Sequence, residues 1–299
     1  MRRSVPVSVV GLGWLVAVAG CHLTALHGPV PADLASSRKL SQQGITSLER
    51  GQSQEAETVL AKAVKTCPTD PDARRYYGEA LWLRGARPEA VAQLEEACRL
   101  SPDDPAVRVR LADMYLAIGR VDLARTTVEQ VIDLNPKLPG AWATRGRISR
   151  VTGDLRQALA DYHRALGYAP GDRQILLETA EVYRQQNEPQ RALETLQSLA
   201  DTYSPGEEPQ QVFYLLGLAY VALQRYDDGI DSFLTALARD RPTPEILYRL
   251  GEAQWLAGQA GNASGALQQA LAIEPRHEPS RALLARIALA QQVSGSVRR

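Results

Sequence analysis

The sequence predicts an all-α solenoid of seven stacked helical hairpins, closed by one C-terminal helix. The main observation is a period of 34 residues, lengthened to 37 at one step, at which small residues and prolines recur. Small residues recur at Gly44, Gly78, Ala112, Gly146, Ala180, Gly217 and Gly251, and again at Ala56, Ala90, Ala124, Ala158, Ala192, Gly229 and Ala263. Prolines recur at Pro68, Pro102, Pro136, Pro170 and Pro275. Within each unit, the i, i+3, i+4, i+7 spacing predicts helices.

The unit that begins at Pro139, counted as position 1, shows the internal pattern. Positions 4, 7, 8 and 11 are Trp142, Arg145, Gly146 and Ser149, and positions 20, 24 and 27 are Ala158, Tyr162 and Ala165. Each set lies on one helical face. Gly153 is expected to end the first helix and Pro170 the second. Small residues at positions 8 and 20 let the two backbones approach closely.

These residues resemble the tetratricopeptide repeat, a 34-residue two-helix unit with the pattern Trp, Leu, Gly, Tyr, Ala, Phe, Ala, Pro. Trp142, Gly146, Ala158, Ala165 and Pro170 match that pattern. Repeats five and six depart from it, because each carries its proline one place late. The resemblance implies a right-handed α-solenoid of helix-turn-helix units over residues 37–277. It is specific for the fold and uninformative about the ligand.

The first 21 residues have the layout of a secretory signal. Arg2 and Arg3 precede an uncharged run over residues 5–20. Val18-Ala19-Gly20-Cys21 resembles the lipobox of bacterial lipoproteins, which implies that residues 1–20 are removed and that Cys21 is acylated. The alternative is an uncleaved membrane anchor. We favour the lipobox, because the apolar run has the length of a signal peptide and ends where the small residues begin.

We therefore divide the chain into four parts. Residues 1–20 are expected to be a signal peptide, 21–36 a tether, 37–277 the seven repeats, and 278–299 a capping helix with a tail. The tether contains Gly28, Pro29 and Pro31 and shows no helical or strand periodicity. The capping helix is expected to run from Glu278 to Val293, followed by a frayed tail.

Local signals mark several helix starts and one insertion. Asp70, Asp104 and Thr243 each precede a proline, which predicts N-caps with proline at the first helical position. The 37-residue step places three extra residues between repeats five and six. A local splay of two helices is the simpler interpretation of this insertion, and a hinge or contact loop is the alternative.

Charge and motifs argue against several functions. The 34 basic and 34 acidic residues balance, so nucleic-acid binding is disfavoured. No nucleophile elbow, phosphate loop or dinucleotide fingerprint occurs, and the repeats leave no room for a catalytic domain. We therefore expect no enzyme activity, no cofactor and no small-molecule substrate.

His163 and His277 have no neighbouring second ligand, so we expect surface histidines and no metal site. Cys67 and Cys98 form either a disulfide or, as we favour, two independent thiols.

The resemblance implies that positions 2, 5, 6, 9, 12 and 13 of each first helix line the concave face. In repeats two to five these positions include Arg75, Tyr76, Glu79, Trp82, Arg110, Asp113, Arg147, Arg150, Glu178, Glu181 and Arg184. We take Tyr76, Trp82, Arg110, Arg147 and Arg150 as candidate partner-binding residues. Two interpretations stay open: a polar peptide groove, or a ladder of charges that pair with one another.

The same positions turn apolar in repeats six and seven. They are Tyr214, Leu215, Leu218, Val221 and Ala222, followed by Tyr248, Trp255 and Leu256. The first helix of repeat six is thereby apolar on all sides, so both its interior face and its concave face need to be covered. Either this face packs inside the fold, or it forms a groove for an apolar or amphipathic partner segment, with Arg249 and Glu252 as its rim.

Together these features predict a lipid-anchored scaffold that binds a protein or peptide partner on its concave face. By architecture the chain is similar to type IV pilus secretin-assembly lipoproteins. The alternative is a non-catalytic subunit that positions a polysaccharide or peptidoglycan enzyme. The expected location is the periplasmic side of a bacterial envelope. His22, rather than Asp, follows Cys21, and by analogy this favours the outer membrane.

Overall fold

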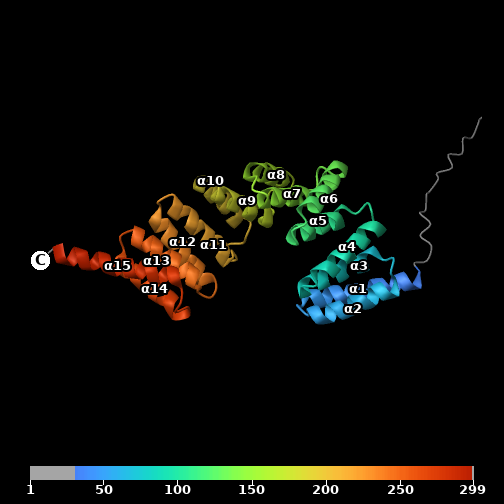
Figure 1. Ribbon diagram of the computed structural model, residues 1–299, viewed down its shortest axis with the longest axis horizontal. Helices are drawn as coiled ribbons and strands as arrows, with labels where there is room; N and C mark the ends of the chain where they lie inside the picture. Colours follow the sequence, from blue (N-terminus) through green and yellow to red (C-terminus); the bar gives the residue numbers. More distant parts are fainter. Residues whose placement is uncertain (1–30, 298–299) are drawn as a thin grey trace, which may run out of the picture.

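The computed structural model describes residues 31–297 of the chain, which are all-α: no strand occurs in that range. The helices are α1 (Ala32–Glu49), α2 (Ser53–Thr66), α3 (Pro71–Arg84), α4 (Arg87–Leu100), α5 (Pro105–Ala117), α6 (Val121–Leu134), α7 (Pro139–Val151), α8 (Leu155–Tyr168), α9 (Arg173–Gln185), α10 (Pro189–Ala200), α11 (Gln210–Ala222), α12 (Tyr226–Arg239), α13 (Pro244–Leu256), α14 (Ala260–Ile273) and α15 (Glu278–Val297). Helices α1 to α14 form seven hairpins, and α15 follows them (Figure 1). The predicted α-solenoid with a C-terminal helix is confirmed.

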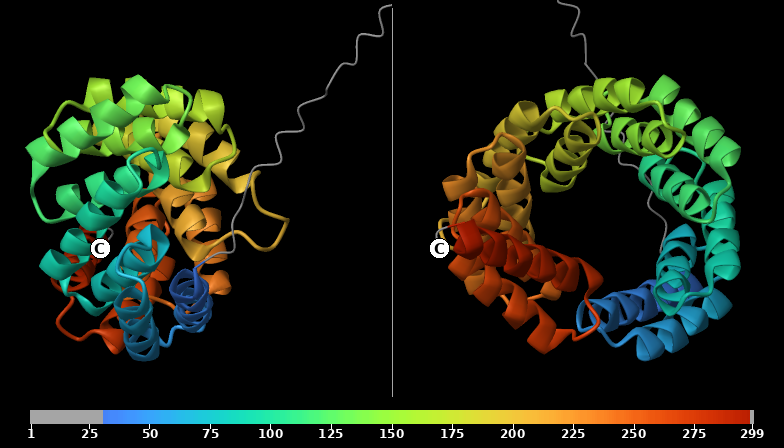
Figure 2. Two further views of the ribbon diagram at one scale, coloured as in Figure 1. Left: turned by 90° about the vertical axis from the view of Figure 1, so that its right-hand side faces the viewer. Right: turned by 60° about the vertical axis from the view of Figure 1, so that its left-hand side comes forward.

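The hairpins stack into a curved array. Each even-numbered helix packs on the odd-numbered helix of its own hairpin and on that of the next. Several odd-numbered helices also touch directly, as α1 touches α3 and α13 touches α15, whereas no two even-numbered helices within residues 31–297 come as close. The odd-numbered helices therefore lie on the inside of the curve and line the concave face. The right-hand view of Figure 2 shows the hairpins following one another around a central opening.

Within a hairpin, position 8 of the first helix receives the side chain at position 24 of the second. Tyr162 is buried against Gly146, and Phe233 against Gly217. A Cβ at Gly146 would lie 2.7 Å from Cε1 of Tyr162, and one at Gly217 would lie 2.5 Å from Cε1 of Phe233. Carbon atoms in contact prefer about 3.5 to 4.0 Å. Glycine is thus required here for the close helix approach that the repeat pattern predicts.

The helix ends follow the expected chemistry. The Asp70 carboxylate accepts a hydrogen bond from the Asp72 amide at 3.1 Å, and the Asp104 carboxylate accepts one from the Ala106 amide at 2.9 Å. The Thr243 hydroxyl accepts one from the Ile246 amide at 3.3 Å. Gly153, directly after the C-cap of α7, has φ 86°, which a residue with a Cβ rarely adopts. The predicted caps and the glycine turn are confirmed.

Two helices are longer than the sequence pattern predicts. Helix α1 begins at Ala32, five residues before the expected repeat boundary, because no residue after Pro31 breaks the helix and Asp33 lies in its first turn. Helix α15 continues to Val297 instead of ending at Val293, since no proline interrupts it. The predicted signal peptide, Cys21 and the tether up to residue 30 lie outside the described residues. No helix within residues 31–297 is both long and apolar enough to cross a membrane.

The insertion between repeats five and six does not separate the two halves of the stack. Helices α9, α10 and α11 share one cluster of buried residues: Leu176, Ala180, Leu193, Leu196, Leu199, Val212, Leu216 and Ala219. The connecting turn is also held from both sides. Arg173 donates to the Thr202 carbonyl at 2.5 Å, and Arg239 pairs with Glu208 at 2.8 Å. These contacts argue against a hinge at the insertion.

Candidate partner-binding groove

The inner helices follow one pairing rule across repeats two to five: position 9 of one repeat meets position 6 of the next. Arg110 pairs with Glu79 through two hydrogen bonds of 2.7 Å each. The Thr144 hydroxyl donates to Asp113 at 2.9 Å, and Arg147 donates to Glu178 at 3.0 Å. The partners in these three contacts are 31 residues apart.

Arg147 joins two of these contacts into a network, because it also pairs with Asp113 of the preceding repeat. Its side chain is 24% exposed, and burial lowers its pKa. The two carboxylates outweigh that effect, so the pKa of Arg147 is raised. The hydrogen bond to Glu79 likewise raises the pKa of Arg110. Apart from Arg150, the charges at these positions are therefore used within the protein, as the ladder interpretation predicts.

The rule fails where repeat five meets repeat six. There, position 9 of repeat five is Glu181 and position 6 of repeat six is Leu215. At the next junction, position 9 of repeat six is Leu218 and position 6 of repeat seven is Arg249. Neither leucine can pair with a charge, so both charged residues find partners elsewhere. Glu181 accepts two hydrogen bonds from Arg184 on α9, at 2.8 and 2.6 Å.

Arg249 donates to Glu245 at 2.8 Å and to Glu252 at 3.0 Å, both on α13. Burial lowers the pKa of Arg249, but these two hydrogen bonds outweigh it and raise the pKa overall. The hydrogen bond to Glu181 raises the pKa of Arg184, and the positive charge of Arg249 acts in the opposite direction.

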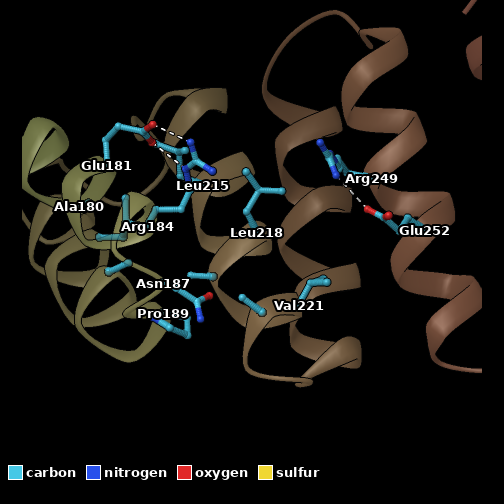
Figure 3. Close-up of a pocket in the computed structure, with 14 residues that line it drawn as sticks. Ala180, Glu181, Arg184, Asn187, Pro189, Leu215, Leu218, Val221, Arg249 and Glu252 are labelled. Carbon is cyan, nitrogen blue, oxygen red and sulfur yellow. Dashed lines mark hydrogen bonds and ion pairs between the residues drawn. The ribbon is translucent and has the colours of Figure 1, made fainter. Parts of the chain in front are cut away.

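A groove of about 300 Å³ opens at this mismatch, between α9, α11 and α13. Figure 3 shows Leu215, Leu218 and Val221 between the two ion-paired walls, Glu181 with Arg184 and Arg249 with Glu252. The full lining is Ala180, Glu181, Arg184, Asn187, Pro189, Ala192, Leu196, Leu215, Leu218, Ala219, Val221, Ala222, Arg249 and Glu252. In each wall the charged side chains pair with one another: Glu181 with Arg184, and Arg249 with both Glu252 and Glu245. The groove therefore offers an apolar floor between walls whose charges are paired.

The structure assigns part of the apolar face of repeat six to the core. Tyr214, Leu218 and Val221 pack against the cluster around Phe233, and the Tyr214 ring lies 6.1 Å from the Phe233 ring. Burial raises the pKa of Tyr214. Leu215, Leu218 and Val221 also line the groove, so this face serves both purposes that the sequence left open.

Tyr248 and Trp255 of repeat seven do not line the groove. Both pack against the cluster of Ala263, Leu267, Leu283 and Ile287, through which α15 is attached. Their apolar character is explained by that contact. His277, expected at the surface, is only 13% exposed: its Nδ1 lies 2.8 Å from the Ser280 hydroxyl, and its ring packs edge-on to Tyr248. It is placed there because the chain turns from α14 into α15 at this residue.

The other candidate residues lie in the self-paired half. The Arg75 guanidinium stacks on the Tyr76 ring, with its Cζ 4.4 Å from the ring centroid. The Arg110 Cζ lies 5.9 Å from the centroid of the Trp82 ring. Arg150 has a buried Nε without a hydrogen-bond partner. The structure does not bring these side chains together with the groove.

Repeat five also contributes Ala180, Asn187, Pro189, Ala192 and Leu196 to the groove, which the pattern of concave positions does not indicate. Ala180 and Ala192 occupy positions 8 and 20, which were assigned to the hairpin interior.

The remaining candidate sites show no catalytic arrangement. Cys67 and Cys98 are free thiols, and burial raises the pKa of Cys98 to about 11. No group of histidine, cysteine, aspartate and glutamate side chains in the described part of the chain is arranged to hold a metal ion.

Sequence comparison decides the family. Tetratricopeptide repeat signatures match residues 42–105, 143–207 and 214–279, and a second such signature matches residues 81–148. The chain belongs to the tetratricopeptide repeat family. It is 23% identical over 237 residues to the TPR repeat-containing protein YpiA of Bacillus subtilis, a match that covers 79% of this chain and 55% of YpiA. It spans 19% of the Hsp70-Hsp90 organizing protein of Triticum aestivum, with 25% identity.

Solved structures show the same fold at low identity. Pseudomonas aeruginosa PilF superposes with a TM-score of 0.56 at 14% identity, covering 85% of this chain and 99% of PilF. YrrB, described as a TPR protein with an unusual peptide-binding site, superposes with a TM-score of 0.56 at 16% identity, covering 64% of this chain and 96% of YrrB.

Proposed function

We propose that this protein is a lipid-anchored scaffold that binds a partner protein through a segment laid into the groove between α9, α11 and α13. The observation that carries the proposal is the change in the concave face at repeat six. From repeat two to repeat five, charged and polar groups at positions 9 and 6 pair with one another, whereas Leu215 and Leu218 of repeat six face the groove without a charged partner.

The chemistry of the groove indicates the kind of segment. Its floor is apolar, and burial of apolar side chains contributes about 25 cal/mol per Å². The walls carry no unpaired charge, so the inserted part of the partner is uncharged and apolar. The volume is at the lower end of the range for small-molecule sites, roughly 300 to 1,000 Å³, and suits a few side chains. YrrB, of the same fold, has a peptide-binding site.

The cellular setting rests on the sequence. The lipobox-like Val18-Ala19-Gly20-Cys21 supports export and acylation at Cys21, facing the periplasm and held at the outer membrane. The combination of this anchor with tetratricopeptide repeats favours a part in assembling an envelope complex, as in type IV pilus secretin-assembly lipoproteins. The accessory subunit of a polysaccharide or peptidoglycan enzyme is the second candidate.

The test is partner capture from solubilised membranes by the affinity-tagged, lipidated protein, followed by mass spectrometry. Leu218→Ser should abolish capture of a partner that the parent retains, because it places a hydroxyl on the groove floor. Since Leu218 also packs against the Phe233 cluster, the melting temperature of this variant is measured as well, and loss of capture supports the groove only where the variant stays folded at the assay temperature. Leu134→Ser is the matched control, since Leu134 is 75% exposed at the end of α6, away from the groove. Equal capture by all three proteins would exclude the groove. Neighbouring genes and the identified partner separate an assembly role from an enzyme-positioning role.

A further inference from the structure

One arginine of the concave face has no ionic partner among residues 31–297. Arg150 lies in the last turn of α7, at position 12 of repeat four. Its side chain is partly buried, its Nε is out of reach of solvent and accepts no hydrogen-bond partner, and the ion pairs around it are formed by other arginines. A guanidinium that loses water without gaining a carboxylate is costly, so a ligand that supplies one is favoured here.

The register of the inner helices places Arg150 beside the groove. Residues 31 apart on neighbouring inner helices meet, as Arg147 of α7 meets Glu178 of α9. The same step from Arg150 leads to Glu181, which lines the groove. The hydrogen bonds from Arg184 lower the pKa of Glu181, and the positive charge of Arg150 acts in the same direction. Arg150 therefore lies on the α7 side of the groove wall that α9 forms.

The carboxylates of α9 are already engaged by other arginines. Glu178 accepts hydrogen bonds from Arg147 at 3.0 Å, and Glu181 accepts two from Arg184 at 2.8 and 2.6 Å. The pair of Glu181 and Arg184 is drawn in Figure 3. At the concave positions of α7 and α9, the arginines Arg147, Arg150 and Arg184 thus face only these two glutamates. Arg150 is the cation left without an anion.

We infer that the partner segment carries an acidic side chain, glutamate or aspartate, that pairs with Arg150 while its apolar side chains enter the groove. The inference rests on the proposed function and adds the charge of the partner to it. A carboxylate fits a guanidinium through two parallel hydrogen bonds. Neighbouring helices lie roughly 10 Å apart, a span that an extended chain covers in about three residues. The acidic residue therefore lies about three residues from the apolar anchor.

Arg150 also stands where a cation stabilises the C-terminal end of a helix. That role affects the stability of α7 and is fulfilled by any cation. It gives the protein no means of distinguishing glutamate from glutamine in a partner. The preference for one of two matched peptides therefore separates a binding role of Arg150 from a role at the helix end.

An array of short peptides, probed with the purified protein in detergent, tests the inference. Each peptide is acetylated and amidated, has a randomised apolar core, and carries either glutamate or glutamine about three residues from it. The parent should bind the glutamate member of a pair about tenfold more tightly. Arg150→Gln should remove this preference, and Arg150→Lys should retain part of it. Arg156→Gln, the same change at an exposed arginine of the outer helix α8, should leave the preference unchanged.

Equal binding of both peptides by the parent, or a preference that survives Arg150→Gln, would overturn the inference and leave the groove in place. Peptide binding that Leu218→Ser does not weaken would overturn the proposed function, and the inference with it. Thermal melts confirm that each variant is folded at the assay temperature. Salt provides a measurement that needs no variant: the preference of the parent for glutamate should shrink as sodium chloride is raised, and a preference that salt leaves unchanged would also contradict the ion pair.

Discussion

Replacing Gly146 with leucine tests the close helix contact on which the fold depends. A Cβ at this position would lie 2.7 Å from Cε1, 2.8 Å from Cδ1 and 3.1 Å from Cζ of Tyr162. These distances fall short of a normal carbon contact by roughly 0.5 to 1 Å. Tyr162 is 0% exposed, so its ring has no free space into which to move.

Two effects of opposite sign set the magnitude. Removing a helix-interior glycine stabilises by up to about 1 kcal/mol, whereas overpacking a core costs about 1 to 3 kcal/mol and occasionally more. Because leucine adds three further carbons beyond Cβ, the upper part of that range applies, and we expect a net loss of about 2 kcal/mol. Ala158→Leu, on the facing helix at 0% exposure, should lose a similar amount.

The matched control is Gly265→Ala in the interior of α14, where an added Cβ meets no atom within 4 Å. This change should stabilise by about 0.5 to 1 kcal/mol through helix propensity alone. Thermal melts followed by circular dichroism compare the variants, at roughly 2 to 4 °C per kcal/mol for a chain of this size. A Gly146→Leu melt within error of the parent would refute the proposed register of the hairpins.

Three further predictions follow from other parts of the chain. Cys21→Ser should abolish fatty-acid labelling and signal removal, since the acyl group needs the thiol; label retained by the variant would exclude the lipobox. Arg147→Met should destabilise by about 1 to 3 kcal/mol, because the partly buried carboxylates of Asp113 and Glu178 lose the cation that joins them. Arg99→Met, which removes the solvent-exposed pair with Glu96, should change the stability far less; urea unfolding distinguishes them, and equal losses would contradict the ladder. With a pKa raised by burial to about 11, Cys98 should hold roughly a hundredfold less thiolate at pH 8 than an unfolded cysteine, so iodoacetamide should label it slowly until pH approaches 11 or urea unfolds the chain.

The fold could be predicted from the sequence because the same packing pattern recurs in all seven repeats. Gly146 and Ala158 are small where backbones approach, and Tyr162 is large where it fills the space between them. The ends of the array were less predictable. Residues 32–36 lie outside the repeated pattern, and a first helix has no preceding unit to define its start, so the extra turn of α1 left no periodic signal.

The groove could be predicted only in part. Leu215 and Leu218 were recognisable because apolar residues replaced charged ones at concave positions. Tyr248 and Trp255 gave the same signal, but their partner is α15, and a sequence pattern does not say which neighbour covers an apolar side chain. Ala180 and Ala192 were hidden for the opposite reason: they lie at standard interior positions and are only 2% exposed, so they border the groove from within the hairpin.

Site-specific photo-crosslinking in cells tests the central claim most directly. A photoreactive phenylalanine analogue at Ala222 lies on the lining of the groove, and one at Ala117 lies at the same position 13 in the self-paired half. The account predicts that Ala222 cross-links a discrete partner protein and that Ala117 does not. Equal cross-linking at both positions, or cross-linking at Ala117 alone, would contradict the division of the concave face into a closed and an open half.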